Sequence, residues 1–299
     1  MYNPQASVLR RLLSGPDFLV LPGVYDALTA KIAERVGFQC LVMGGYSIAA
    51  SRLGQPDVGY LTMTEMAQAV KTICDAAPLP LFADGDTGYG NALSVQRTVI
   101  EYEKAGAAAI LFEDQVWPKR CGHMQGKEVI SSDEHATKIR AAKDACSNPD
   151  TVIIARTDSR AVLGLDEAIR RGRQYFDAGA DALFIEAPQD ESELAAIGNA
   201  FPGKVLLANM IEGGKTPILA PEQLQKLGFK VVFWPCTALY AVLKSLEEVF
   251  SELHRTGTTT GVGDRLHSFS HFNQLIGLSD YAALEKKYGI NKKNEEVSP

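Results

Sequence analysis

The chain has 299 residues, of which 46% are hydrophobic and 22% are charged, and its formal net charge is −6. This composition is typical of a compact protein that can bury a large core. The negative charge argues against a nucleic-acid partner, and no apolar run approaches the roughly 20 residues that span a bilayer. We therefore expect neither nucleic acid nor a membrane among the partners of this protein.

The cysteines are few and scattered. They are Cys40, Cys74, Cys121, Cys146 and Cys236. Their odd number, without a recognisable signal peptide, favours reduced thiols over a disulfide framework. The expected compartment is therefore the cytoplasm.

Apolar runs that alternate with helical stretches predict a repeated strand-and-helix pattern. A helix is expected at Val8–Leu13, a first strand at Phe18–Pro22 and a helix at Val24–Val36. Seven further strands are expected at Phe38–Met43, Leu79–Ala83, Ala107–Phe112, Thr151–Ala155, Ala182–Ile185, Lys204–Ala208 and Lys230–Trp234. Each of these runs is followed by a segment that can form a helix.

A glycine marks four of the joints between a helix and the next strand, at Gly37, Gly106, Gly179 and Gly228. Glycine suits the left-handed conformation that ends a helix. Eight strand-helix units in a chain of this length match the (β/α)₈ barrel, which typically spans about 250 residues. We therefore predict an α/β fold in which residues 1–255 form a (β/α)₈ barrel.

The C-terminal segment, residues 256–299, is expected to lie outside the barrel. The eighth helix is expected at about Leu239–Leu253, and Thr256–Gly263 has the Thr- and Gly-rich composition of a linker. Short helices are predicted around Phe269–Ile276 and Tyr281–Tyr288. The last residues, 291–299, are expected to be frayed.

Polar residues follow the predicted strands at the end where barrel enzymes carry their active sites. Asp84 and Asp86 follow the third strand, and Glu113 follows the fourth. Carboxylates that meet on one rim repel each other, and a bound Mg²⁺ or Mn²⁺ relieves that repulsion with oxygen ligands. Asp84 and Asp86 alone could instead cap a helix or brace a turn. The addition of Glu113 favours the metal site.

The segment Glu113–His123 concentrates reactive groups in one polar loop. Cys121 is a candidate catalytic thiol, although a lone cysteine is more often a core residue, and Lys119, Arg120 and His123 are expected to lower its pKa. His123 could be only a hydrogen-bonding loop residue, and Arg156 could be a structural clamp for the carboxylates.

Six motifs together resemble the isocitrate lyase/phosphoenolpyruvate mutase superfamily, and in particular its 2-methylisocitrate lyase and 2-alkylmalate lyase branch, which includes the petal death protein. They are Pro22–Asp26, Leu53–Asp57, Asp84–Gly90, Glu113–His123, Ala155–Asp158 and Asn209–Pro217. The resemblance implies a barrel that exchanges its eighth helix with a neighbouring subunit, a homotetramer, and magnesium-dependent chemistry on small keto or hydroxy dicarboxylic acids.

The resemblance also implies residue roles. Asp84 and Asp86 match the magnesium-associated pair, with Asp57 and Glu113 in the surrounding shell. The backbone amides of the segment from Gly44 through Gly45 to Tyr46 match the group that holds the substrate carboxylate. Substrate contacts are matched by Arg156, Glu186 and Asn209, and the mobile gating loop by Lys119, Cys121, Gly122 and His123, with Cys121 as the acid.

Departures from the family pattern narrow the expected activity. Methylisocitrate lyases hold a third carboxylate with two arginines, and this chain has Tyr240 and Phe269 at those positions. An unpaired buried carboxylate costs several kcal/mol, so a smaller dicarboxylate is favoured. The expected reaction is retro-aldol cleavage of a 2-alkylmalate-like acid into an α-keto acid and a carboxylic acid.

Other functions remain open at this point. The same site could serve an oxaloacetate acetylhydrolase or decarboxylase, although such hydrolases often carry a serine where this chain has Pro235. A methylisocitrate lyase or a carboxyphosphonoenolpyruvate phosphonomutase is less favoured. A non-catalytic binding barrel is disfavoured, because an inert scaffold has no need of this set of carboxylates and a thiol.

Overall fold

The computed structural model describes residues 3–124 and 126–290. The chain divides into two compact units, residues 1–240 and 241–299. The boundary falls inside helix α11 (Thr237–Thr256), whereas the sequence predicted it at residue 255, near the end of that helix. Among the side chains of α11 only Val249 is buried, which explains why the division falls within the helix.

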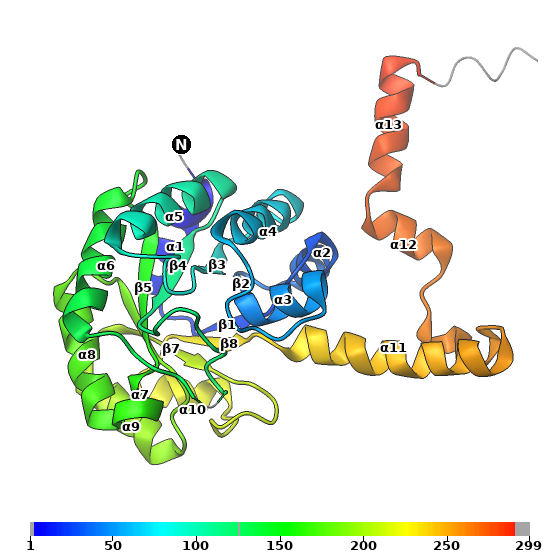
Figure 1. Ribbon diagram of the computed structural model, residues 1–299. Coiled ribbons are helices and arrows are strands. Elements are labelled where there is room, and N and C mark those ends of the chain that lie inside the picture. The colour runs from blue at the N-terminus through cyan, green and yellow to red at the C-terminus, as the bar shows by residue number, and fades with distance from the viewer. Residues whose placement is uncertain (1–2, 125, 291–299) are drawn as a thin grey trace, which may run out of the picture. The chain divides into compact units, whose positions relative to one another are not determined.

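Eight parallel strands form a nearly closed barrel at the centre of the first unit (Figure 1). They are β1 Leu19–Pro22, β2 Leu41–Met43, β3 Leu81–Asp84, β4 Ala109–Glu113, β5 Val152–Thr157, β6 Ala182–Ile185, β7 Val205–Asn209 and β8 Val231–Trp234. Neighbours pair in chain order from β2 to β8, and β1 pairs with β8. A single bridge between Gly23 and Val42 links β1 to β2. The predicted α/β fold and its eight strands are confirmed.

Helices surround the strands of this unit in Figure 1. They are α1 Pro4–Ser14, α2 Ala27–Val36, α3 Gly45–Leu53, α4 Met63–Ala76, α5 Ala92–Ala105, α6 Ser132–Ala145, α7 Ser159–Leu163, α8 Leu165–Asp177, α9 Glu191–Ala200 and α10 Pro221–Lys226. Gly37, Gly106, Gly179 and Gly228 all have φ angles between +91° and +104°, as the sequence predicted. Helix α2 begins later than expected because the Asp26 side chain caps it by accepting a 2.7 Å hydrogen bond from the Thr29 amide.

The strands are buried on both faces, which is why they read as continuous apolar runs. One cluster of buried side chains fills the barrel interior and includes Leu21, Phe82 and Phe184. A second cluster lies between the strands and the helices and includes Ile110 and Ile153. The barrel is therefore a packed core and not a channel.

Helix α1 covers the end of the barrel at which the strands begin. The Asn3 side chain donates to the carbonyls of Gly106 and Ala107, which precede β4, at 2.9 and 3.0 Å. Arg10 donates to the carbonyl of Thr151, which precedes β5, at 2.9 Å. These contacts close the amino end of the barrel and leave the carboxyl ends of the strands for a site.

The second unit contains most of α11, a 3₁₀ helix at Thr260–Arg265, α12 (Phe269–Leu275) and α13 (Leu278–Tyr288). The two predicted short helices are confirmed, but the predicted linker Thr256–Gly263 is partly wrong, because its second half lies in the 3₁₀ helix. The segment expected to be frayed, 291–299, lies outside the described residues. No helix in the described part of the chain is long and apolar enough to cross a membrane.

Candidate active site

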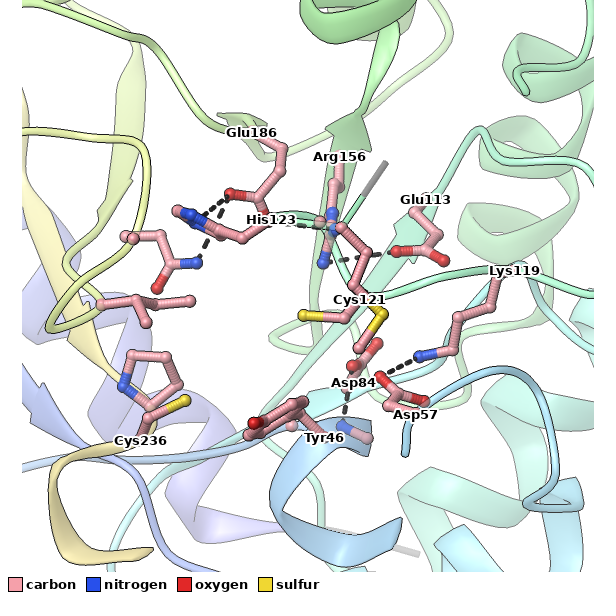
Figure 2. Close-up of a pocket in the computed structure, with 18 of the residues that line it drawn as sticks. Tyr46, Asp57, Asp84, Glu113, Lys119, Cys121, His123, Arg156, Glu186 and Cys236 are labelled. Carbon is pink, nitrogen blue, oxygen red and sulfur yellow. Dashed lines mark hydrogen bonds and ion pairs between the residues drawn. The ribbon is translucent and has the colours of Figure 1, made fainter. Parts of the chain in front are cut away.

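A cavity of about 250 Å³ opens at the carboxyl ends of the strands (Figure 2). The predicted site residues that line it are Gly44, Gly45, Tyr46, Asp57, Asp84, Glu113, Lys119, Cys121, Gly122, His123, Arg156, Glu186 and Asn209. Asp86 does not line the cavity but is buried beside Lys119. Residues spread over most of the barrel sequence therefore meet at one place, as the sequence predicted.

Asp84 is fixed where β3 meets the start of α3. Its Oδ1 accepts a 2.9 Å hydrogen bond from the Asp86 amide, and its Oδ2 accepts a 3.0 Å bond from the Gly45 amide. A Cβ atom at residue 45 would lie 3.0 Å from Lys119 Nζ and 3.3 Å from Asp86 Oδ1. Glycine at this position therefore lets the helix start approach the acidic groups closely.

Lys119 lies between two carboxylates. Its Nζ is 2.6 Å from Asp57 Oδ2 and 2.7 Å from Asp86 Oδ1, and only 3% of its side chain is exposed. Burial opposes the charge on Lys119, but Asp86 and Asp57 outweigh it and hold its pKa well above the ordinary value. Lys119 is therefore charged in this arrangement and presents a cation to the cavity.

The carboxylates fit a divalent cation. Burial raises the pKa of Asp86 to about 6 despite Lys119, and burial raises the pKa of Glu113 well above its usual range. Glu113 Oε1 is buried without a hydrogen-bond partner in the described structure. No three His, Cys, Asp or Glu side chains of the described residues form a direct metal cluster, so an ion here would complete its shell with water. The hard oxygen donors suit Mg²⁺.

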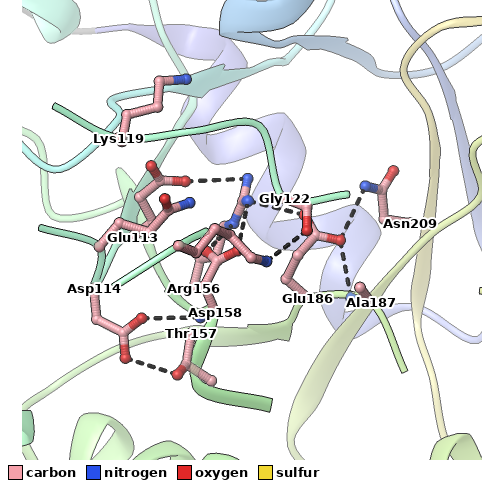
Figure 3. A network of polar contacts seen from close by, with 12 residues as sticks. Glu113, Asp114, Lys119, Gly122, Arg156, Thr157, Asp158, Glu186, Ala187 and Asn209 are labelled. Carbon is pink, nitrogen blue, oxygen red and sulfur yellow. Dashed lines mark hydrogen bonds and ion pairs between the residues drawn. The ribbon is translucent and has the colours of Figure 1, made fainter. Parts of the chain in front are cut away.

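Arg156 forms the centre of a second cluster of charges, shown in Figure 3. Its guanidinium lies 2.9 Å from Asp158 Oδ2, 3.0 Å from Glu186 Oε2 and 3.3 Å from Glu113 Oε2. Burial lowers the pKa of Arg156, but these carboxylates outweigh burial and hold it well above its ordinary value. Arg156 thus clamps the carboxylates, as the structural alternative supposed, and at the same time presents a cation to the cavity.

Cys121 begins a tight turn of the loop after β4. Its amide donates a 3.3 Å hydrogen bond to the Asp57 carbonyl, and its own carbonyl accepts a 2.8 Å bond from the Met124 amide. The next residue, Gly122, packs directly on the Arg156–Glu186 ion pair, since a Cβ there would lie 2.2 Å from Glu186 Oε2. The turn therefore lies over the charged cluster.

The expected lowering of the Cys121 pKa is wrong. Burial raises the pKa of this thiol to about 11, and nearby Glu186 adds to the effect. The cations that were expected to stabilise a thiolate are engaged elsewhere, because Lys119 pairs with Asp57 and Asp86, and His123 faces Glu186. Cys121 therefore keeps its proton at neutral pH.

His123 is held between two loops. Its Nδ1 accepts a 3.0 Å hydrogen bond from the Lys215 amide, so the ring proton belongs on Nε2, which lies 3.3 Å from Glu186 Oε1. Glu186 Oε1 also accepts a 3.0 Å bond from the Ala187 amide. Burial raises the pKa of Glu186, but Arg156 and His123 lower it more, so the carboxyl is ionised. This geometry supports the hydrogen-bonding interpretation of His123.

The opposite wall of the cavity comes from β7, β8 and the start of α11. Tyr240, Cys236 and Pro235 lie here, and the Tyr240 hydroxyl lies near the Cys236 thiol and the Tyr46 hydroxyl. Burial raises the pKa of Cys236 to about 12, so this thiol is also protonated. Phe269, the other position that departs from the family pattern, is 86% exposed in the second unit.

Two groups of residues near the cavity were not predicted from the sequence. Met124, Ile211, Gly213 and Gly214 line the cavity without having been predicted. Lys127 was also missed, although its Nζ is buried 2.6 Å from Asp158 Oδ1. A lysine four residues beyond His123, where the segment singled out in the sequence ends, was the signal that could have identified it.

Residues 9–254 match the phosphoenolpyruvate phosphomutase family. The chain belongs to this family. Among curated members, 2,3-dimethylmalate lyase of Eubacterium barkeri is 48% identical over 96% of this chain and 99% of its own length. The petal death protein of Dianthus caryophyllus is 44% identical over 94% and 89%, and the 2-methylisocitrate lyase of Aeropyrum pernix is 42% identical over 97% and 92%.

Solved structures of the family agree in fold. A crystal structure of 2,3-dimethylmalate lyase, described as a PEP mutase/isocitrate lyase superfamily member, superposes with a TM-score of 0.91 at 35% identity and full coverage of both chains. Oxaloacetate acetylhydrolase with the inhibitor 3,3-difluorooxalacetate gives 0.89 at 35%, covering 95% and 97%. Phosphonopyruvate hydrolase with oxalate and Mg²⁺ gives 0.85 at 32%, covering 95% and 99%. The predicted superfamily is confirmed, and the chain is an enzyme related to the oxo-acid lyases.

Proposed function

We propose that this enzyme is a magnesium-dependent lyase that cleaves a 2-alkylmalate-like hydroxy dicarboxylic acid by retro-aldol reaction into an α-keto acid and a carboxylic acid. The main support is the position of the Cys121–Gly122–His123 turn, which lies over the Arg156–Glu186 pair and faces the carboxylates in one cavity. The 48% identity to a 2,3-dimethylmalate lyase supports the same class of substrate.

Asp84, Asp86, Asp57 and Glu113 are the residues that would hold Mg²⁺, with Mn²⁺ as an alternative ion. When bound, the ion supplies a Lewis acid for the negative charge that develops on the keto-acid oxygen. Lys119 adds a fixed positive charge to the same region. Together these charges would favour loss of the substrate's hydroxyl proton, because they stabilise the alkoxide from which the carbon–carbon bond breaks.

The keto-acid end of the substrate is proposed to bind at the start of α3. The first amides of a helix have no partner within the helix, and they favour negative charge. Gly44 is the N-cap of this nine-residue helix and carries no side chain to block access. Arg156 and Asn209 line the same cavity and would orient the acid from the other side.

Cys121 is proposed to donate a proton to the carbanion carbon of the departing carboxylic acid. A thiol that remains protonated at neutral pH is suited to this task, since it arrives with its proton in place. The substrate hydroxyl gives up its proton to a base in the cavity, the carbon–carbon bond breaks as the C–O bond becomes a carbonyl, the electron pair of the broken bond moves to the departing fragment, and the thiol proton completes that fragment. Neighbouring Arg156 would then stabilise the thiolate that remains.

The cavity favours a dicarboxylate over a tricarboxylate. Where methylisocitrate lyases are expected to carry an arginine, Tyr240 presents a hydroxyl near Cys236 and Tyr46 and no cation. A third carboxylate would therefore be desolvated without a cation. Hydrolysis of oxaloacetate is the second candidate, because an oxaloacetate acetylhydrolase superposes over 95% of this chain.

A substrate panel tests this proposal. Oxaloacetate, 2-methylmalate, 2,3-dimethylmalate, methylisocitrate and phosphonopyruvate are incubated with enzyme and Mg²⁺, and the products are identified by mass spectrometry. We expect the highest kcat/KM with an alkylmalate, loss of turnover with EDTA, and recovery with Mg²⁺. Fastest turnover of oxaloacetate to oxalate and acetate would establish the hydrolase instead, and turnover unaffected by EDTA would remove the metal from the mechanism.

We further propose a homotetramer in which helix α11 packs on a neighbouring subunit. Leu243, Leu246, Phe250 and Leu253 lie on one face of this helix, and each is at least 42% exposed. Apolar rows of this kind are typical of subunit interfaces. Light scattering coupled to size exclusion measures the mass directly, and Leu246→Glu with Phe250→Glu should shift it towards smaller species. A monomeric wild-type enzyme would contradict the assembly.

A further inference from the structure

Lys127 is a buried cation to which the proposed mechanism gives no role. Its side chain is only 1% exposed. It belongs to the stem of the loop after β4, where Gln115 bridges to Val129 and the Val116 amide donates a 2.9 Å hydrogen bond to the Glu128 carbonyl. Lys127 is therefore attached to the anchored base of the loop, while Cys121 lies in its outer turn.

Two acceptors hold the Lys127 ammonium. Its Nζ lies 2.6 Å from Asp158 Oδ1 and 2.5 Å from the carbonyl oxygen of Gly122. A buried ammonium remains charged only with such partners. Because the second partner is the peptide that follows Cys121, Lys127 connects the stem of the loop to the turn that carries the thiol.

The Gly122 peptide is held from both sides. On one side it packs against Arg156 and Glu186 (Figure 3), where a Cβ would lie 2.5 Å from Arg156 Nη2. Gly122 has no side chain, so among the described residues the Lys127 hydrogen bond is the polar contact that fixes its carbonyl. Loss of that bond would leave a buried carbonyl without this donor and favour movement of the turn towards water.

Asp158 connects the same lysine to Arg156. The Asp158 carboxylate accepts hydrogen bonds of 2.9 and 3.1 Å from the Arg156 guanidinium in addition to the bond from Lys127. Burial raises the pKa of Asp158, but Arg156 and Lys127 lower it more, so the carboxyl stays ionised. One ammonium therefore fixes both the turn and the carboxylate that orients Arg156.

We infer that Lys127 is a positioning residue that holds the Cys121–Gly122–His123 turn closed over Arg156 and so places the Cys121 thiol for proton transfer. Lys127 acts through Gly122 and Asp158 and does not itself line the cavity. Its effect on turnover rests on the proposed function. Its effect on the accessibility of Cys121 does not, so the two ideas can fail separately.

The first test measures iodoacetamide alkylation of individual cysteines by peptide mass spectrometry. In Lys127→Met, Cys121 should react faster by about tenfold or more, because opening of the turn exposes the thiol. Mg²⁺ with oxalate should protect Cys121 in the wild-type enzyme and protect it less in the variant. Core residue Cys40, which is 1% exposed, reports global unfolding and should stay unreactive.

Lys143→Met is the matched control. Lys143 is also a lysine in an ion pair, 2.8 Å from Asp181, but it lies near the amino end of β6, at the opposite end of the barrel from the cavity. Its removal should leave both Cys121 alkylation and turnover unchanged. Lys127→Arg retains a cation and should restore part of the protection that Lys127→Met loses.

Kinetics on the best substrate of the panel provide the second readout. Lys127→Met should lower kcat by about 10²-fold with KM changed much less, because a displaced thiol affects proton transfer more than binding. If Lys127→Met does not fold, the double variant Lys127→Met/Asp158→Asn is measured in its place, because it removes both charges of the ion pair. Wild-type alkylation rates in the folded variant, or failure of both variants to fold, would overturn the positioning role and leave Lys127 a structural residue.

Discussion

Nδ1 of His123 accepts a 3.0 Å hydrogen bond from the backbone amide of Lys215. His123 belongs to the loop after β4 and Lys215 to the loop after β7, so this bond joins the two loops beside the cavity. Gly214 permits the contact, because a Cβ at that position would lie 2.7 Å from His123 Nδ1 and 3.0 Å from the Ile211 carbonyl. The two loops are therefore expected to close together.

Gly214→Ala should uncouple the loops. The added methyl group cannot fit without displacing His123 or the Ile211 backbone, so we expect kcat/KM to fall by roughly 10–100-fold with little change in Tm. Steady-state kinetics and a thermal melt measure the two effects. Gly263→Ala, where a Cβ meets nothing within 4 Å, is the control. Unchanged kinetics in Gly214→Ala would show that the loops close independently.

Asp84→Ala should remove most of the activity without unfolding the barrel. The residue lies at the end of β3 and its carboxylate serves the proposed ion, so the loss should affect turnover and metal affinity and leave the core intact. Circular dichroism and titration with Mn²⁺ measure folding and metal binding. Asp75→Ala, an exposed acid on α4, is the control. Loss of folded protein in both Asp84→Ala and Asp86→Ala would make these residues structural.

Cys121→Ser should separate binding from chemistry. Serine keeps a similar size and a hydrogen-bonding group but is a much weaker acid, so kcat should fall by roughly 10²–10⁴-fold while oxalate affinity changes little. Turnover on the best substrate and calorimetric binding of oxalate with Mg²⁺ test the two parts. Cys236→Ser, which alters the other thiol of the cavity, distinguishes loss of an acid from a general effect of thiol removal. Near-normal turnover in Cys121→Ser would exclude this thiol as the proton donor.

His135 should make the protein less stable in mild acid. Its side chain is fully buried, and burial, with Lys138 and Arg171 nearby, lowers its pKa to about 3. Below the unfolded pKa of about 6.5, the unfolded chain binds a proton that the folded chain refuses, so stability falls as the pH drops from 6.5 towards 3. The contribution is at most about 1.4 kcal/mol per pH unit.

Urea unfolding of His135→Phe between pH 4 and 7 measures this contribution. The free energy of unfolding of the variant should depend less steeply on pH than that of the wild type. His271 lies in the second unit and is not buried, so His271→Phe should keep the wild-type slope. Equal slopes for the wild type and His135→Phe would mean that His135 does not couple to folding.

Tyr240→Arg should shift substrate preference towards a tricarboxylate. The substitution places a cation in the wall of the cavity that Tyr240 now lines, where a third carboxylate could pair with it. The ratio of kcat/KM for methylisocitrate to that for 2-methylmalate should rise by about tenfold or more. Tyr240→Phe controls for loss of the hydroxyl. No change in the ratio with arginine present would refute the assigned position of the third carboxylate.

The barrel could be predicted from sequence because its signals are local. The buried strands are apolar runs in the sequence. The glycines at helix ends are needed because the backbone there has a positive φ angle, which other residues rarely adopt. The ends of the strands were predicted less accurately where polar residues take part in the pairing between strands. Arg156 and Thr157 continue β5 because they pair with Phe184 and Ile185, which a search for apolar runs cannot detect.

The site could be predicted as a location but not as an electrostatic system. The strand ends brought the carboxylates, Arg156 and Cys121 together as expected. The Cys121 pKa could not be predicted from its neighbours in sequence, because Lys119 pairs with Asp57, 62 residues away, and not with the thiol. Charge pairing across the fold determines which cations remain to act on a given group.

The barrel is closed asymmetrically, and this affects the order in which it can form. Strand β1 has a four-residue ladder with β8 but only one bridge next to β2, its neighbour in sequence. During synthesis, β1 therefore gains its main partner only after residue 234 has been made. Until then its edge is exposed, and exposed edges promote aggregation. A fragment that stops before Val231 should therefore be more aggregation-prone than one that ends just after Trp234.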